Sequence, residues 1–160
     1  MLVMGVDPGT AITGFGLVRY LGDRFQLMSC SCIRTPPDLP LASRLAVLYR
    51  ELGRIIEVQK PVCMALEELF FNKNTRTALA VGHARGAAML AAANAGIPVY
   101  EYTPLQVKLA VTGYGRADKK QVQFMVKSIL GMAKAPSPDD VADALAVAIC
   151  HAHLGGARCR

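Results

Sequence analysis

The sequence predicts a single α/β domain over residues 1–160, with helices on both faces of a mixed five-stranded sheet. Apolar runs near the N-terminus are separated by short turn signals, which is typical of antiparallel hairpins. Later apolar runs alternate with segments of helical periodicity, which is typical of parallel strands added to a sheet. A hydrophobic fraction of 52% with a charged fraction of 19% describes an ordered globular chain. The last few residues are expected to form a flexible tail.

The first three elements are predicted to be strands. Residues 2–7 form a continuous apolar run, which is typical of a fully buried strand. The glycines of 9–14 predict a turn, and residues 15–20 predict the second strand. A turn signal at 22–23 precedes residues 24–34, which predict the third strand. Strands joined this closely are expected to pair as antiparallel hairpins.

The rest of the chain alternates between helix and strand. After three prolines, leucine and isoleucine recur at helical spacing from Leu41 to Ile56 and predict the first helix. Residues 62–68 suit a central strand, the Ala-rich segment 75–95 predicts a helix, and residues 97–102 predict the last strand. Three helices are then expected at 104–111, 118–131 and 138–153. In such sheets the carboxyl ends of the strands form the ligand crevice.

The charge balance favours a polyanionic partner. The chain has 18 Lys and Arg against 12 Asp and Glu, a net charge of +6, for which nucleic acid is the default candidate. A basic solvated surface would give the same net charge. The positions of the basic residues favour the first interpretation, because many of them follow Glu67, among them Arg76, Arg85, Lys108, Arg116, Lys119, Lys120 and Lys127.

The N-terminus and the cysteines predict where the protein works. No basic region precedes the first apolar stretch, and no run reaches the roughly 18 apolar residues of a membrane span, so neither a signal peptide nor a span is expected. Five cysteines, an odd count, predict reduced thiols in a reducing compartment. His151 and His153 follow the last helical pattern and are expected to face solvent.

Four acidic residues lie at the ends of predicted core elements. Asp7 ends the first strand, Glu67 ends the fourth, and Asp140 and Asp143 open the last helix. Burying one unpaired ion costs several kcal/mol, and four such penalties would rival a typical domain stability of roughly 5–15 kcal/mol. The acids therefore either point outward separately or converge on a cation. The second alternative explains why they lie at the ends of core elements.

Each acid also has a purely structural interpretation. Asp7-Pro8-Gly9 is strong turn chemistry, although the turn between the first two strands is expected later, around Gly14. Ser137-Pro138 suits a helix N-cap followed by the first helical position, and capping would explain Asp139-Asp140. Capping leaves Asp143 unexplained, because it lies one turn above Asp140 on the same helix face.

Other residues leave two alternatives open. Glu67 and Glu68 face opposite sides of a strand, and alternation alone does not choose between them. The rings of 70–71 lie beside Lys73, where an aromatic can stack on an exposed base or pack inward. Lys119-Lys120 begins a helix, where it can form a solvated face or contact phosphates.

Together these features resemble the RuvC family of Holliday junction resolvases, which have the ribonuclease-H-like fold. The similar segments run through nearly the whole chain: GVDPGTAITGFG, CIRT, ALEELFFNKN, ARGAAMLAAANAGIPVYEY, QVK, GYGRADKKQVQ and DDVADALAVAICHAH. The resemblance implies catalytic and metal-binding roles for Asp7, Glu67, Asp140 and Asp143. It favours Glu67 over Glu68, because the family's glutamate closes an apolar triplet as Ala65-Leu66-Glu67 does.

The resemblance also implies DNA-contacting residues. Lys108 and Lys119 match the family's basic positions near the junction, and Phe70 matches an aromatic implicated in stacking at the strand exchange point. Arg116, in the loop before Lys119, is added to this DNA-binding set.

The expected function is structure-selective cleavage of four-way DNA junctions by paired symmetric nicks, in DNA recombination and repair. Two Mg²⁺ ions, with Mn²⁺ as a substitute, would serve each site and leave 5′-phosphate and 3′-hydroxyl ends. The expected partners are a second copy of the chain and the RuvA–RuvB branch-migration complex, in a bacterial cytoplasm at the nucleoid. The alternatives are another ribonuclease-H-fold nuclease that acts on RNA or flaps, and a catalytically silent junction-binding protein.

Overall fold

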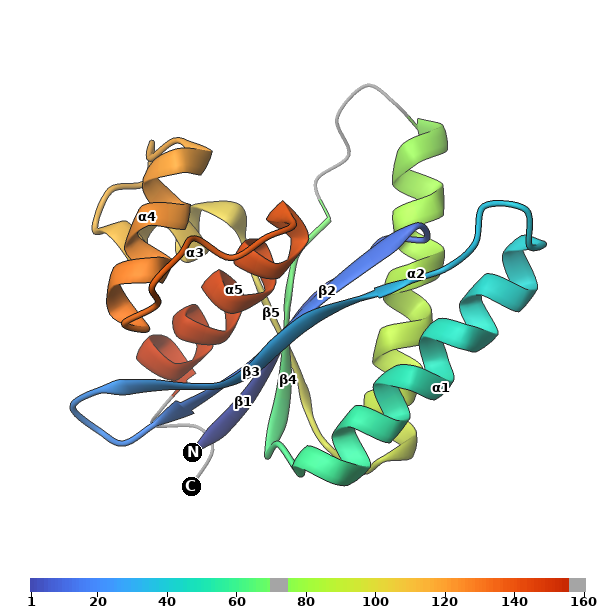
Figure 1. The fold of residues 1–160 in the computed structure, drawn as a ribbon, viewed down its shortest axis with the longest axis horizontal. Helices are drawn as coiled ribbons and strands as arrows, with labels where there is room; N and C mark the ends of the chain where they lie inside the picture. Colours follow the sequence, from blue (N-terminus) through green and yellow to red (C-terminus); the bar gives the residue numbers. More distant parts are fainter. Residues whose placement is uncertain (70–74, 156–160) are drawn as a thin grey trace.

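A mixed sheet organises the computed structural model of this chain, which describes residues 1–69 and 75–155, with side chains from Ala78 onward in the second range (Figure 1). The strands are β1 (Leu2–Asp7), β2 (Ile12–Tyr20), β3 (Phe25–Arg34), β4 (Cys63–Glu67) and β5 (Val99–Tyr102). The helices are α1 (Leu41–Gln59), α2 (Thr75–Asn94), α3 (Pro104–Thr112), α4 (Lys119–Ile129) and α5 (Asp139–Gly155). Phe70 and the expected C-terminal tail lie outside the described residues.

The sheet topology confirms the predicted fold class. The strand order is β3-β2-β1-β4-β5, in which β1, β2 and β3 are antiparallel neighbours. Strands β4 and β5 are added in parallel on the other side of β1. Helices α1 and α2 cover one face of the sheet, and α3, α4 and α5 cover the other (Figure 1).

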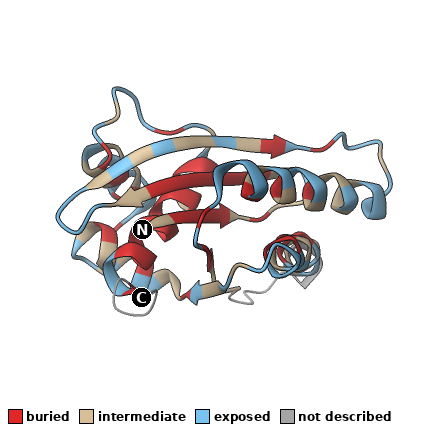
Figure 2. Ribbon diagram, turned by 90° about the horizontal axis from the view of Figure 1, so that it is seen from below, coloured by how far each residue is buried: buried red, intermediate tan, exposed pale blue. Residues whose placement is uncertain are grey.

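Alternating residues of the central strands fill two cores. Val3 of β1 and Cys63 of β4 belong to the core beneath α3, α4 and α5, whereas Met4 and Met64 belong to the core beneath α1 and α2. Figure 2 shows buried residues concentrated along the central strands of this sandwich. A strand buried on both faces requires apolar residues at every position, which explains the continuous apolar runs of the sequence.

The prediction that the first turn lies around Gly14 is wrong. Strand β2 begins at Ile12, so the turn is made by the residues directly after Asp7, and Gly14 pairs with Asp7 inside the hairpin. A Cβ atom at Gly14 would overlap the backbone carbonyl of Asp140 in α5. The glycine is therefore needed for close contact between helix and strand, and this need has no local signature in the sequence.

Two further glycines allow α5 to approach the sheet. Gly5 of β1 pairs with Gly16 of β2, and both lie on the same face as Asp7 and Gly14. A Cβ atom at Gly5 would overlap the carbonyl oxygen of Ala144, and one at Gly16 would overlap the side chain of Leu145. The backbone of α5 thus rests directly on the backbones of β1 and β2.

The expectation that His151 faces solvent is also wrong. Helix α5 continues to Gly155, and His151 is fully buried while His153 is exposed. The Nδ1 atom of His151 lies 2.7 Å from the hydroxyl of Tyr102, and its Nε2 atom lies 3.2 Å from Sγ of Cys63. Burial lowers the pKa of His151, so the ring is neutral at pH 7. Within the described residues no helix has the length and hydropathy of a membrane span.

We predict that Gly5→Ala destabilises the fold, whereas Gly53→Ala in α1 stabilises it. The methyl group at Gly5 overlaps α5, and overpacking of this kind typically costs about 1–3 kcal/mol. Gly53 lies inside a helix with open space at its Cβ position, so alanine there should add about 0.5–1 kcal/mol. Urea denaturation of the two variants measures both effects. Equal effects at the two positions would contradict the close packing of α5.

Candidate active site

Two of the four predicted acids lie at the ends of neighbouring parallel strands. Asp7 is the last residue of β1 and Glu67 the last residue of β4. Cys63 and Ala65 of β4 pack beneath α5, and alternation places the side chain of Glu67 on that same face. Glu68 lies one residue further and therefore points to the opposite face. The register of β4 supports the choice of Glu67 that the sequence pattern alone left open.

Helix α5 brings the other two acids to this end of the sheet. Asp140 lies in its first turn, against Gly14 of β2, and Asp143 lies one turn further along. The negative charges of Asp143, Asp140 and Glu67 each help to raise the pKa of Asp7. Asp143 also raises the pKa of Glu67. The four carboxylates therefore share one electrostatic environment, which favours convergence over separate, outward-pointing acids.

Burial is the largest cause of these pKa shifts. Desolvation and the neighbouring carboxylates raise the pKa of Asp7 from 3.8 to about 7. Desolvation also raises the pKa of Glu67 and of Asp143. Raised pKa values show that nearby positive charge does not fully balance the negative charge of these acids. Groups with perturbed pKa values are typical of functional clefts.

A cleft of about 210 Å³ opens beside these acids. Its lining includes Glu67 and Asp143 together with two basic residues, Lys108 of α3 and Lys119 of α4. Both lysines lower the pKa of Glu67 and so oppose the effect of burial. Carboxylates and ammonium groups line the same small cleft, as a site for a metal-bound phosphate requires.

Lys119 is held in place by acids of α5. Its Nζ atom lies 3.2 Å from Oδ2 of Asp139 and 3.3 Å from Oδ2 of Asp143. Asp118 and Gln121 form a capping box that begins α4 at Lys119. A cation at a helix N-terminus is disfavoured by the helix dipole, and the two carboxylates offset this cost. Asp139, which the sequence assigned only to capping, thus positions a basic residue of the cleft.

The turn after Asp7 is fixed by hydrogen bonds that sequence patterns did not reveal. The hydroxyl of Thr13 donates to the carbonyl of Gly9 at 2.7 Å. The guanidinium of Arg44 in α1 donates to Thr35 at 2.8 Å and to the carbonyl of Thr10 at 2.9 Å. These contacts join the turn to α1 and to the end of β3. The backbone that presents Asp7 is therefore anchored from two sides.

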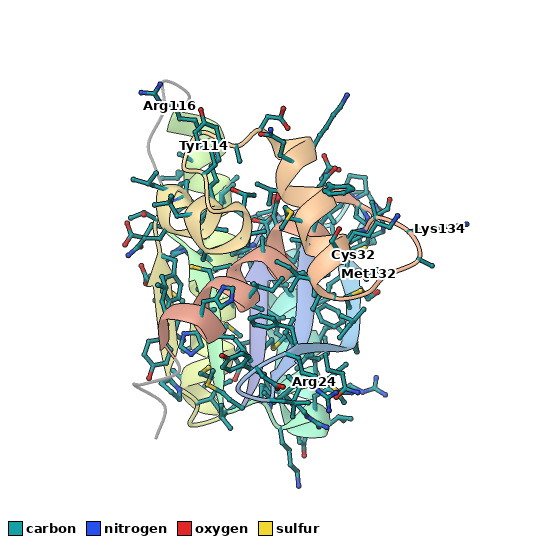
Figure 3. All side chains as sticks on the ribbon, turned by 90° about the vertical axis from the view of Figure 1, so that its left-hand side faces the viewer. Arg24, Cys32, Tyr114, Arg116, Met132 and Lys134 are labelled. Atoms are coloured by element: carbon teal, nitrogen blue, oxygen red, sulfur yellow. The ribbon has the colours of Figure 1, made fainter. Side chains whose placement is uncertain are left out.

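The predicted DNA-contacting residues differ in their placement. Lys108 and Lys119 lie in the cleft, and Arg116 is exposed in the loop between α3 and α4, where Figure 3 shows it pointing outward beside Tyr114. Phe70 lies outside the described residues. Arg85, counted above among the basic residues that favour a polyanionic partner, is only 8% exposed and pairs with Glu101. It is not available to a DNA backbone.

The donor set fits a hard divalent cation. Glu67 and Asp143 line the cleft, and Asp7 and Asp140 interact electrostatically with these acids. Carboxylate oxygens are the ligands that Mg²⁺ and Mn²⁺ prefer. Within residues 1–69 and 75–155, no group of three or more His, Cys, Asp or Glu side chains is arranged so that it could hold a metal ion in this structure. The ammonium group of Lys119 pairs with Asp143 and so neutralises part of the negative charge that a metal ion would neutralise. Added cations would relieve the repulsion that raises the pKa of Asp7.

The fold and this site together define a class, the nucleases of the ribonuclease-H-like fold. The family model described as crossover junction endodeoxyribonuclease RuvC matches residues 3–151. The RuvC of Pelotomaculum thermopropionicum is 67% identical over 153 residues, which cover 96% of this chain and 93% of that protein. The RuvC of Desulforamulus reducens is 65% identical over 152 residues, which cover 95% of this chain and 93% of that protein.

Solved structures agree with this assignment. A Thermus thermophilus RuvC in complex with a Holliday junction substrate superposes with a TM-score of 0.92 at 39% identity, over 97% of this chain and 94% of that one. The yeast mitochondrial Holliday junction resolvase, at 16% identity and a TM-score of 0.65, shares the fold. The present chain belongs to the RuvC family of crossover junction endodeoxyribonucleases, and it is an enzyme of that class.

We predict that Asp7→Asn raises the free energy of unfolding at pH 8 but not at pH 4, both measured in EDTA. Near pH 4 the folded carboxyl is protonated and the unfolded one is only partly ionised, so the raised pKa costs little stability there. As the pH rises toward about 7, only the unfolded chain ionises freely, so the folded state loses stability. A shift of this size corresponds to at most about 4 kcal/mol, which the amide avoids. Urea denaturation at the two pH values measures the gain. An equal gain in the free energy of unfolding at pH 4 and pH 8 would contradict the raised pKa of Asp7.

Proposed function

We propose that this enzyme resolves four-way DNA junctions by paired, symmetric hydrolysis of phosphodiesters. The observation that carries the proposal is the electrostatic coupling of Asp7 to Glu67, Asp140 and Asp143, beside a cleft that is lined by Glu67, Asp143, Lys108 and Lys119. A Thermus thermophilus relative with the same fold holds a Holliday junction substrate. Recombination and DNA repair are the processes in which such junctions must be cut.

The four carboxylates would hold two Mg²⁺ ions, with Mn²⁺ as a substitute. Bound ions of this kind activate water and stabilise the leaving oxygen of a phosphodiester, which gives 5′-phosphate and 3′-hydroxyl ends. Asp7 and Glu67 offer their oxygens from strand ends, whose backbone is fixed by the sheet. Asp140 and Asp143 offer theirs from a rigid helix. Ligands on such elements keep their geometry more precisely than ligands on loops.

The basic residues would bind and stabilise the phosphate groups. Lys119, held over the cleft by Asp139 and Asp143, would offset the charge that develops on the phosphate during hydrolysis. Lys108 would contact the same strand from α3. Arg116 would contact phosphates of the DNA beyond the cleft. Phe70, which lies outside the described residues, would stack at the exchange point.

The enzyme would act as a twofold homodimer. Productive resolution needs two symmetric cuts, and the described part of the chain carries one cluster of these acids. Along α2, Leu79, His83, Gly86 and Leu90 are exposed and recur at the spacing of a helix–helix seam. Leu79 is 66% exposed and Leu90 55%, and nothing lies within 4 Å of a Cβ atom built at Gly86. The opposite face of α2 packs on the protein through Ala84 and Ala88.

The cellular setting follows from the same proposal. The RuvA–RuvB branch-migration complex would deliver the junction, in a bacterial cytoplasm at the nucleoid. Both relatives named above are bacterial proteins. Among the alternatives, cleavage of RNA or flaps would use the same acids, whereas a silent junction-binding protein would have no need of all four. Substrate preference therefore distinguishes the proposed resolvase from a nuclease that acts on RNA or flaps. Cleavage of the junction distinguishes it from a silent junction-binding protein.

We predict that Glu67→Gln lowers the cleavage rate on a synthetic four-way junction by at least about a thousandfold, while Glu68→Gln changes it little. The two residues are neighbours, but only Glu67 faces α5. Junction affinity, measured with Ca²⁺ in place of Mg²⁺, should change by less than about threefold, because binding depends mainly on Lys and Arg. Linear duplex, a flap and an RNA–DNA hybrid serve as competing substrates. Faster cleavage of the hybrid or the flap would favour the alternative nuclease.

We predict that Leu79→Arg combined with Leu90→Arg yields a monomer that no longer makes paired cuts. Two buried arginines would face their symmetry mates across the seam, and like charges there are strongly unfavourable. Leu21→Arg, at an exposed leucine of the β2–β3 hairpin, is the matched control and should leave the dimer intact. Sedimentation equilibrium at micromolar concentration measures the assembly. A monomer that still makes paired cuts would refute the dimer proposal.

A further inference from the structure

A buried arginine contacts the backbone of the proposed catalytic glutamate. Arg85 lies on the inner face of α2 with a side chain that is 10% exposed. Its Nη1 atom donates a hydrogen bond to the main-chain carbonyl of Glu67, and its Nη2 atom lies 2.8 Å from Oε2 of Glu101 in β5. One guanidinium therefore joins α2 to the ends of both parallel strands.

The same peptide group is held from its other side. The amide of Glu68 donates to the carbonyl of Tyr102 at 2.8 Å. The carbonyl of Glu67 and the amide of Glu68 belong to one planar peptide unit. With its oxygen bound to Arg85 and its nitrogen bound to β5, this unit cannot rotate freely. Its orientation fixes the backbone from which the carboxylate of Glu67 projects.

Stability alone does not account for an arginine at this position. Burying a guanidinium costs several kcal/mol, and well-packed apolar residues are often equal or better in its place. Such a residue would leave the carbonyl of Glu67 without this donor at the end of β4, so the Glu67–Glu68 peptide would be held through its amide but not through its carbonyl. An arginine supplies two donors in a rigid fork, which suits a carbonyl and a carboxylate at once.

We propose that Arg85 is a positioning residue, which fixes the Glu67–Glu68 peptide so that the Glu67 carboxylate faces Asp7 and the acids of α5. The inference rests on the proposed role of Glu67 in cleavage. It assigns Arg85 no contact with DNA, because the side chain is buried and paired. A small displacement of a catalytic group can reduce a rate about a hundredfold.

The test compares Arg85→Met, which keeps the length of the side chain, with Glu101→Gln, which removes the ion pair but leaves the bond to Glu67. Single-turnover cleavage of a bound four-way junction should fall about tenfold to a hundredfold in Arg85→Met and less than about threefold in Glu101→Gln. Junction affinity with Ca²⁺ should be the same for both. Arg85→Lys keeps the charge but lacks the fork, and it should show an intermediate loss.

Amide hydrogen exchange gives a readout that a purely structural role would not produce. In Arg85→Met, and more weakly in Arg85→Lys, the Glu68 amide should exchange faster, while the Met64 amide, bonded to the carbonyl of Pro98 in the same pair of strands, should not. Equal acceleration at both amides, or cleavage at the wild-type rate, would overturn the inference. Glu67→Gln is measured alongside. If it is inactive while Arg85→Met is normal, only the inference about Arg85 fails, and if it is active, the proposed site fails.

Discussion

The close contact between α5 and the β1–β2 hairpin brings the acids of α5 to the end of the strand that carries Asp7. Three glycines, Gly5, Gly14 and Gly16, remove the side chains that would otherwise separate the helix from the strands. The Ala-rich inner face of α5 completes the contact, with Ala144 and Ala148 fully buried. Because the first turn of α5 rests on the strand that pairs with Asp7, its carboxylates come to the end of β1. A helix held at an ordinary distance would not bring these charges together.

This packing produces a site with too much negative charge for its surroundings. Burial and mutual repulsion raise the pKa of Asp7 to about 7, and Lys108 and Lys119 offset only part of the effect at Glu67. The cost is confined to one end of a sheet that has a hydrophobic core on each face. Binding of divalent cations would turn the unfavourable cluster into a favourable one. The same charges that destabilise the folded chain would therefore provide its affinity for metal.

Sequence patterns predicted the sheet, its helices and the four acids, because these depend on local periodicity and on the cost of burying charge. Gly14 was misplaced in a turn, since its purpose is contact with α5, which lies far along the chain. The expectation that His151 faces solvent is wrong because its partners, Tyr102 and Cys63, come from β5 and β4, which lie far from it in the sequence. Arg85 was grouped with basic surface residues for the same reason. Local sequence shows that a residue is polar or small, but the partner that explains it is set by the tertiary fold.

The position of bound metal ions tests the proposed site of four carboxylates. Crystals of the enzyme with a four-way junction whose scissile linkages resist hydrolysis would be soaked in Mn²⁺ and measured for anomalous scattering. We expect two peaks per chain, within coordination distance of Asp7, Glu67, Asp140 and Asp143 and next to the scissile phosphate. Peaks bound elsewhere, or a junction phosphate in the cleft without metal between it and these carboxylates, would contradict the proposed site.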